Sequence, residues 1–286
     1  MNGKKLPRYE ELSKPLAIFS YKWFKWGLVR FFLNTVGRLS KGIRIGFKYG
    51  FDSGTMLDYV YENKPEGLFF IGKIIDKAYL DGPGWAGIRQ RKVHLKGILR
   101  EVIESNRKIN KGTVIMDVAS GPCRYLIEIK QEHPKYDLKI LCRDMDEAGL
   151  SLGRKLCSRL GIEGIKYEKA DAFSPEILKN ANPKPNVIVV SGLYELFTND
   201  EIIKKSMGNI FTALNSGDYF VFTNQPYHPQ LELIARTLPN RLKEFWVMRL
   251  RSDNQVKSWA TAAGFKHIKT LLDTYSIFSV NLFQKQ

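Results

Sequence analysis

The sequence lacks the usual features of a disulfide-rich, metal-binding or membrane-spanning protein. Its 286 residues contain four scattered histidines and no C-x-x-C pair, and the only cysteines are Cys123, Cys142 and Cys157. Without the short spacings of zinc ligands or a disulfide framework, we expect buried thiols and no metal. No apolar run approaches the roughly 18 to 20 residues that span a bilayer, and no apolar leader with a cleavage site begins the chain. We therefore expect an intracellular, cytoplasmic protein.

Positive charge is what the chain has in excess, and it is unevenly distributed. The net charge is +16, and residues 1–50 contain eleven Lys and Arg but only two Glu, a net charge of +9. A basic N-terminal arm thus precedes a more balanced body. The apolar content of 44% is ample for a buried core.

From residue 113 onward, short β-rich runs alternate with segments of helical periodicity. The predicted strands are Thr113–Val118, Leu138–Cys142, Ile165–Lys169, Asn186–Ser191 and Tyr219–Thr223. The predicted helices are Arg124–Gln131, Glu147–Leu160, Pro175–Asn180, Asp200–Leu214 and Asn254–Ala263. This alternation is typical of βαβ units, so we expect a doubly wound α/β fold whose mostly parallel sheet carries helices on both faces.

The two ends of the chain depart from this alternation. Lys266–Leu272 and Ser276–Phe283 predict two strands joined at Asp273-Thr274, so that a seven-stranded sheet ends in an antiparallel hairpin. Residues 1–112 predict a helical cap or lid with one long helix over Trp85–Asn106. We therefore divide the chain into a basic cap, residues 1–112, and a sheet-bearing domain, residues 113–286.

Polar and small residues follow the first three predicted strands. The first strand leads into Asp117-x-Ala119-x-Gly121-x-Cys123, and the second ends at Asp144, 27 residues after Asp117. Ligands of doubly wound sheets bind beyond these strand ends, where a small-residue turn allows close approach and a carboxylate takes ribose hydroxyls. The third strand leads into Asp171, which suits an adenine amine. Together these strand ends predict an adenosine site.

These residues resemble the S-adenosylmethionine site of class I methyltransferases, whose sheet also ends in an antiparallel pair, and the resemblance covers residues 113–286. It implies S-adenosyl-L-methionine as the cofactor. The cofactor-binding residues are then Asp117, Ala119, Gly121, Arg124, Asp144, Met145, Asp171, Ala172, Phe173 and Ser191. A dinucleotide site is disfavoured by the final hairpin and by the incomplete G-x-G-x-x-G pattern.

A closer resemblance covers almost the whole chain. It rests on the segments at residues 51–61, 87–92, 192–197 and 225–236, which include Gly192-Leu193-Tyr194-Glu195-Leu196-Phe197. They are similar to a family of bacterial methyltransferases, some of which are fused behind a lipase-like α/β-hydrolase domain. The resemblance implies the cofactor but not the acceptor.

Candidate catalytic residues follow the fourth and fifth strands. Tyr194 either shapes the pocket and contacts the sulfonium through its ring or is a packing residue. Glu195 either serves as a base or acceptor-cation ligand or is an acid at a helix start. His228 is a further candidate base, since histidine titrates near neutrality. Arg89, Arg91 and Arg124 compete as partners of the methionine carboxylate.

The basic arm also contains many aromatic residues, notably in Ile18–Leu33. Three interpretations remain open: a cap packed on the core, an interfacial helix at an anionic membrane surface, and a nucleic-acid-binding arm, the last being the least favoured. We hypothesise a methyltransferase for a lipid or other amphipathic small molecule, peripheral to the inner membrane face. The alternatives are an RNA methyltransferase and a non-catalytic S-adenosylmethionine-binding protein.

Overall fold

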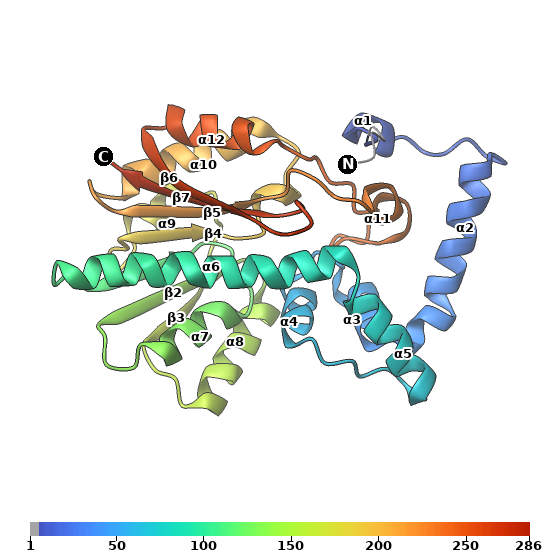
Figure 1. Cartoon of the computed structure of the whole chain (residues 1–286), viewed down its shortest axis with the longest axis horizontal. Helices are drawn as coiled ribbons and strands as arrows, with labels where there is room; N and C mark the ends of the chain where they lie inside the picture. Colours follow the sequence, from blue (N-terminus) through green and yellow to red (C-terminus); the bar gives the residue numbers. More distant parts are fainter. Residues whose placement is uncertain (1–5) are drawn as a thin grey trace. The chain divides into compact units, whose positions relative to one another are not determined.

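The computed structural model describes residues 6–286 and contains the predicted seven-stranded sheet (Figure 1). Its strands are β1 (Thr113–Asp117), β2 (Leu138–Asp144), β3 (Ile165–Lys169), β4 (Val187–Val190), β5 (Tyr219–Asn224), β6 (Phe265–Leu272) and β7 (Ser279–Lys285). The strand order is β3-β2-β1-β4-β5-β7-β6. The first five strands pair in parallel, whereas β7 is antiparallel to both β5 and β6. The predicted fold class is confirmed.

One connection of the sheet differs from the prediction. The last two strands are joined by residues 273–278 and not by Asp273-Thr274 alone, because Asp273 organises a longer turn. Its Oδ1 accepts a hydrogen bond from the Tyr275 N–H at 2.7 Å, and Oδ2 accepts one from the Phe278 N–H. An aspartate that binds its own following backbone is a common turn former, so β7 begins only at Ser279.

Helices cover both faces of the sheet, because alternate strand residues point in opposite directions. The face with Ile115, Ile140 and Val187 packs with α6 (Pro83–Lys108) and α7 (Arg124–Glu132), and α8 (Glu147–Leu160) packs on α7. The face with Met116, Ile188 and Phe220 packs with the helices α9 (Pro175–Lys179), α10 (Asp200–Ala213) and α12 (Asp253–Ala262).

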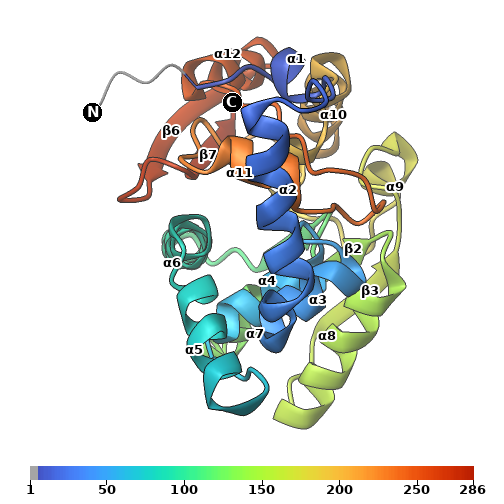
Figure 2. The ribbon, with the colours of Figure 1, turned by 90° about the vertical axis from the view of Figure 1, so that its right-hand side faces the viewer.

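The N-terminal part is helical, as predicted, and is broken into short pieces (Figure 2). The pieces are α1 (Tyr9–Leu12), α2 (Tyr21–Asn34), the 3₁₀ helix η1 (Val36–Leu39), α3 (Lys41–Tyr49), α4 (Gly54–Glu62) and α5 (Phe69–Leu80). The break between α2 and α3 comes from an N-cap, since the Ser40 hydroxyl accepts from the Ile43 N–H at 3.0 Å and starts a new helix. Lys4 and Lys5 of the predicted arm lie outside the described residues.

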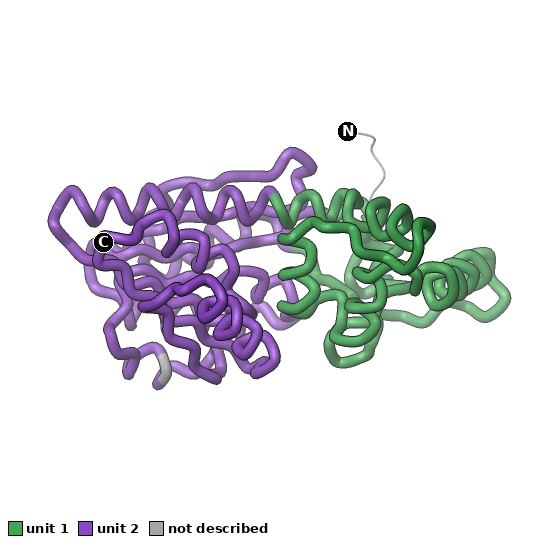
Figure 3. Tube along the Cα trace, turned by 90° about the horizontal axis from the view of Figure 1, so that it is seen from below, with its two compact units in different colours: residues 1–89, 228–250 green, residues 90–227, 251–286 purple. Residues whose placement is uncertain are grey.

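A later segment joins these helices. Residues 228–250, with α11 (Leu231–Thr237), form one compact unit with the chain up to residue 89, called unit 1 (Figure 3). Residues 90–227 and 251–286 form unit 2. Within unit 1, α11 packs against α2, and Lys22 pairs with Glu232 at 2.8 Å. The units thus divide within α6 and not at residue 112.

Candidate functional site

The candidate site lies at the carboxyl ends of the parallel strands of unit 2. Successive connections run from β1 outward to β2 and β3, and then return to place β4 on the other side of β1. The strand order therefore reverses between β1 and β4, which is the switch point where open α/β sheets bind ligands. Loops from both strands meet there, and the Val118 N–H donates to the Val189 carbonyl at 3.2 Å.

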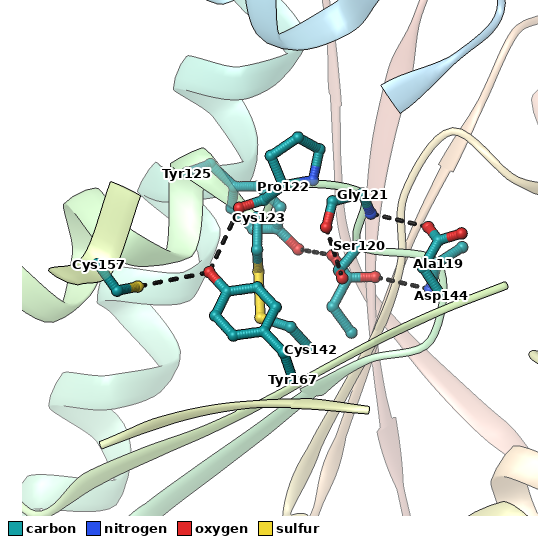
Figure 4. Close-up of a disulfide and its surroundings, with 11 residues drawn as sticks. Ala119, Ser120, Gly121, Pro122, Cys123, Tyr125, Cys142, Asp144, Cys157 and Tyr167 are labelled. Carbon is teal, nitrogen blue, oxygen red and sulfur yellow. Dashed lines mark hydrogen bonds between the residues drawn. A yellow bond between two sulfur atoms is a disulfide. The ribbon is translucent and has the colours of Figure 1, made fainter. Parts of the chain in front are cut away.

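The loop after β1 is a tight turn fastened to β2 (Figure 4). Gly121 has φ 52°, in the left-handed region that favours glycine. Its N–H donates to Asp144 Oδ2 at 2.8 Å, while Asp144 Oδ1 accepts from the Asp146 N–H at 2.9 Å. The structure therefore brings together Asp117, Ala119 and Gly121 from one strand end and Asp144 from the next, as expected for a cofactor loop.

A disulfide lies directly under this loop and overturns part of the sequence analysis. Cys123 and Cys142 are bonded to each other, so only Cys157 remains as the expected buried thiol. The reason is tertiary: Cys123 follows the turn, and parallel pairing places Cys142 of β2 opposite the end of β1. The Tyr167 hydroxyl donates to the Pro122 carbonyl at 3.3 Å and also lies 3.5 Å from Cys157 Sγ.

Asp117 is fully buried at the end of β1. Its carboxylate accepts hydrogen bonds from the Tyr125 hydroxyl and from the Ala119 N–H. Burial raises the pKa of Asp117 to about 7; the nearby Asp144 adds to the rise, while the hydrogen bonds and the Arg91 guanidinium oppose it. The carboxyl group therefore changes charge near neutral pH.

The residues expected around adenine occupy two neighbouring strand ends. Met145 follows β2 and is 57% exposed, so its side chain is accessible to a ligand. Beyond β3, Asp171 Oδ1 accepts from the Phe173 N–H at 3.0 Å, and the Phe173 ring packs on Phe197 with a centroid distance of 4.7 Å. Ala172 is half-buried beside them, against the core. The two ends are linked, because the Ala170 N–H donates to the Asp144 carbonyl at 3.0 Å.

Beyond β4, the two candidate catalytic residues have different surroundings. After Ser191 and Gly192, Tyr194 and Glu195 lie in the 3₁₀ helix η2 (Tyr194–Leu196). Tyr194 is buried in the core, with its hydroxyl 2.9 Å from Ser206 Oγ and its ring 6.1 Å from that of Phe222. Burial raises the pKa of Tyr194 further above its already high usual value. These contacts are those of a packing residue.

One carboxylate oxygen of Glu195 has a hydrogen-bond partner and the other has none. The Thr223 hydroxyl donates to Oε1 at 2.8 Å and itself accepts from the Gly192 N–H at 2.8 Å, so its proton is directed to Glu195. Arg91 Nη1 lies 3.8 Å from the same oxygen. Oε2 is buried without a hydrogen-bond partner. Burial raises the pKa of Glu195, and Arg91 opposes the rise.

The structure separates the competing cations. Arg89 belongs to unit 1, where Nη1 donates to the Leu80 carbonyl at 2.9 Å, and Lys92 pairs with Glu128 at 2.8 Å. Arg91 is only 3% exposed and lies beside Glu195. Arg124 begins α7 and is half-buried. Of the predicted carboxylate partners on α6, Arg91 is thus the one at the strand ends.

His228 belongs to unit 1, whereas the other candidate residues belong to unit 2. Its Nδ1 accepts a hydrogen bond from the Gln230 N–H at 3.1 Å, so Nε2 carries the proton of the neutral ring. Burial lowers the pKa of His228 to about 4. The ring is therefore neutral at pH 7. The predicted catalytic roles of Tyr194, Glu195 and His228 stay predictions.

Thr223 is the site residue that the sequence analysis missed. It follows the apolar run Tyr-Phe-Val-Phe in β5, precedes Asn224 and is 1% exposed. A buried hydroxyl needs hydrogen-bond partners, so a threonine directly after an apolar strand segment could have been recognised as a candidate site residue. Among residues 6–286, no three His, Cys, Asp or Glu side chains gather as metal ligands.

Comparisons with known proteins agree with this geometry. A family model described as "Putative methyltransferase" matches residues 1–285. The uncharacterized protein YnbC of Escherichia coli (strain K12) is 37% identical over 252 residues, which are 87% of this chain and 43% of YnbC. The chain therefore spans less than half the length of this curated relative.

Two solved structures share the fold at low identity. A possible exported protein from Bordetella parapertussis has a TM-score of 0.63 at 16% identity, covering 82% of this chain and 79% of its own. Magnesium protoporphyrin IX methyltransferase from Synechocystis PCC 6803, with bound S-adenosylhomocysteine, has a TM-score of 0.53 at 10% identity, covering 91% and 99%.

Proposed function

Because the chain belongs to the family described as putative methyltransferases, we propose that it transfers the methyl group of S-adenosylmethionine to a lipid or other amphipathic small molecule at an anionic membrane surface. The family and the fold confirm the predicted enzyme class and its cofactor. The acceptor and the membrane are proposals, and the surface of unit 1 is the observation that carries them.

That surface consists of two exposed sets of apolar side chains, here called the aromatic face. On α2, Tyr21, Phe24, Leu28, Phe31 and Phe32 recur at helical spacing and are all more than half exposed. The start of α5 adds Phe69, Phe70, Ile71 and Ile74, with Phe69 81% exposed. Both helices contact η1, and both are seen in Figure 2. Exposed apolar side chains in this number, on two helices that both contact η1, indicate an interaction surface.

The charge around the aromatic face favours an anionic lipid surface as its partner. Residues 12–51 contain eight Lys and Arg and no Asp or Glu. Lys25 on α2 and Lys73 on α5 are exposed beside the apolar side chains. Interfacial helices combine apolar and aromatic side chains with cations that meet anionic headgroups. Aromatic side chains can stack on bases, but the aliphatic Leu28, Ile71 and Ile74 offer RNA no such contact, which makes RNA the weaker candidate.

The rest of α2 supports this orientation. Its opposite face is occupied within unit 1, where Trp26 is buried and Arg30 Nη1 donates to the Arg236 carbonyl of α11 at 3.0 Å. The helix is therefore anchored on one side and exposes its apolar side chains on the other. Among residues 6–286, every helix falls short of the length or hydropathy of a membrane-spanning helix.

The residues of unit 2 fit the cofactor and supply the chemistry around it. S-Adenosylmethionine brings a methyl group on a sulfonium that is open to in-line attack. The turn at Gly121 and the Asp144 carboxylate would hold its adenosine part. Glu195, fixed through Oε1, would present Oε2 to the acceptor and take its proton or bind its positive charge. A positioned nucleophile needs little more, since alignment provides most of the rate.

The test supplies the purified chain with methyl-labelled S-adenosylmethionine and an extract whose lipids are presented in phosphatidylglycerol vesicles. We expect label in the lipid fraction, and we expect the Asp144→Ala variant to lose it. Label in RNA instead would favour the RNA methyltransferase. Cofactor binding without transfer to any fraction would favour the non-catalytic alternative.

A further inference from the structure

Arg91 is a buried cation at the switch point of the sheet. Its guanidinium is 3% exposed, and it lies over the Phe278 ring at 4.9 Å from the centroid. A Cβ added to Gly192 would stand 3.3 and 3.4 Å from its two terminal nitrogens. The guanidinium is thus packed against the backbone at the end of β4, and Gly192 leaves room for it.

One carboxylate is paired with this cation. Arg91 Nη1 is 3.8 Å from Glu195 Oε1, which is an ion-pair distance but too long for a hydrogen bond. Arg91 also opposes the raised pKa of Asp117, more weakly than the hydrogen bonds of that carboxyl group do. The guanidinium therefore lies at the end of β4, beside Gly192 and Glu195.

Other features of unit 2 keep the guanidinium in this place. Thr223 fixes the Glu195 oxygen that faces it, and Phe278 covers it through a cation–π contact. Its helix is fastened nearby, because Lys92 and Lys96 both pair with Glu128 of α7. A guanidinium orientated in this way is pre-organised to take a carboxylate through paired, charge-assisted hydrogen bonds.

We infer that Arg91, and not Arg124, binds the α-carboxylate of the cofactor, and that Glu195 and Thr223 position its guanidinium for that contact. The inference rests on the proposed function, since it needs S-adenosylmethionine at this site. It selects one of the arginines that the sequence left in competition. It also gives the Glu195 side chain two tasks, with Oε1 facing Arg91 and Oε2 left for the acceptor.

Two ligands separate this contact from the rest of the cofactor site. S-Adenosylhomocysteine carries the amino-acid end, whereas 5′-methylthioadenosine has the same adenosine and thioether but ends in a methyl group. We expect Arg91→Gln to weaken S-adenosylhomocysteine binding by about tenfold to a hundredfold, the usual loss for a charge-assisted hydrogen bond. Its affinity for 5′-methylthioadenosine, measured by the same calorimetric titration, should stay within about twofold.

Arg100→Gln, at an exposed arginine of the same helix that pairs with Glu132, is the matched control and should leave both affinities unchanged. Arg124→Gln tests the competing assignment and should lack the loss specific to S-adenosylhomocysteine. Arg91→Lys should fall between the wild type and Arg91→Gln, because lysine keeps the charge but loses the planar fork. Removing one partner of a buried pair can unfold the protein, so the double variant Arg91→Met with Glu195→Gln is included. It should fold, bind 5′-methylthioadenosine normally and bind S-adenosylhomocysteine as weakly as Arg91→Gln.

Several results would overturn the inference. They are an equal loss for both ligands, no loss in Arg91→Gln, and a loss specific to S-adenosylhomocysteine in Arg124→Gln. A wild-type chain that binds neither ligand would reject the proposed function as well, so the two failures are distinguishable.

Discussion

Units 1 and 2 differ in how many of their large apolar side chains are exposed. Among residues 6–286, 25 such side chains are exposed and 16 of them belong to unit 1, although unit 1 has 112 residues against 174 in unit 2. Unit 2 buries its apolar residues on both faces of one sheet. Unit 1 has no strand of that sheet and assembles short helices instead. The surface of unit 1 is thus richer in exposed apolar side chains than that of unit 2.

Polar groups show the reverse contrast. Unit 2 buries Asp117 and Glu195 beyond strand ends and Arg91 beside Glu195, although burying charged groups is costly, and such clusters are often functional. Unit 1 has its own buried carboxylate, Asp76, but the fold uses it fully: it accepts from the Ser40 hydroxyl, from the Gly42 and Glu66 N–H groups, and from the Tyr59 hydroxyl. Binding chemistry is therefore expected in unit 2 and surface attachment in unit 1.

Removing the aromatic face should have the largest effect, and only on attachment. The triple variant Phe24→Ser, Leu28→Ser and Phe31→Ser should weaken binding to phosphatidylglycerol vesicles about a thousandfold. Each of the three apolar side chains should contribute roughly tenfold when the membrane partly buries it. Co-sedimentation measures the binding. S-Adenosylhomocysteine affinity should not change. The matched control is Leu152→Ser, Leu160→Ser and Ile202→Ser, which removes three exposed apolar side chains of unit 2. Unchanged vesicle binding in the first variant, or an equal loss in both variants, would contradict the assignment of membrane attachment to unit 1.

Breaking the disulfide should affect unit 2 alone. Cys142→Ser frees a loop closed across 19 residues, and we expect the free energy of unfolding to fall by about 3 kcal/mol. Denaturant titration with and without a reductant checks this: reduction should destabilise the wild type and leave the variant unchanged. Vesicle binding should stay the same. A wild type that is insensitive to reductant would show that the bond contributes no stability.

Removing the Asp144 carboxylate, which we expect to bind the ribose, should weaken cofactor binding without affecting vesicle binding. Asp144→Ala should weaken S-adenosylhomocysteine binding about a hundredfold, because it removes two charge-assisted hydrogen bonds and the anchor of the Gly121 N–H. Calorimetry gives the affinity. Asp137→Ala is the control, since Asp137 directly precedes β2, at the end opposite Asp144, and its side chain is 70% exposed. A loss below fivefold would argue against the assigned ribose position.

A change of pH should alter the affinity for S-adenosylmethionine more than the affinity for its product, S-adenosylhomocysteine. Asp117 has a pKa of about 7, so it is protonated below that pH and negatively charged above it. S-Adenosylmethionine carries a positive sulfonium, and its affinity should rise by about threefold to tenfold from pH 6 to 8. S-Adenosylhomocysteine, with an uncharged sulfur, should respond less, and Asp117→Asn should remove the difference. Parallel pH curves for both ligands in the wild type would contradict this role.

Local pattern made much of unit 2 predictable. β3 and α8 begin and end where the sequence predicts, and β1 ends within one residue of the prediction, because alternating or periodic apolar residues define such elements locally. The positions of Asp117, Gly121 and Asp144 at strand ends followed from the same pattern.

Contacts between distant segments were not predictable in the same way. The Cys123–Cys142 bond depends on the pairing of β1 with β2, and spacing alone gave no sign of it. The return of residues 228–250 to the N-terminal helices likewise depends on packing, such as that of Lys22 with Glu232. Thr223 became a site residue only when β5 placed it beside Gly192 and Glu195.

The sequence by itself determined the fold class, the family, the cofactor and the basic aromatic character of the N-terminal arm, because periodicity, motif order and composition are properties of the chain. Only the tertiary structure decided which face of α2 is exposed, which arginine reaches the strand ends and which oxygen of Glu195 is free. These features depend on contacts between residues far apart in the chain, and no local pattern encodes which side chains such contacts leave open.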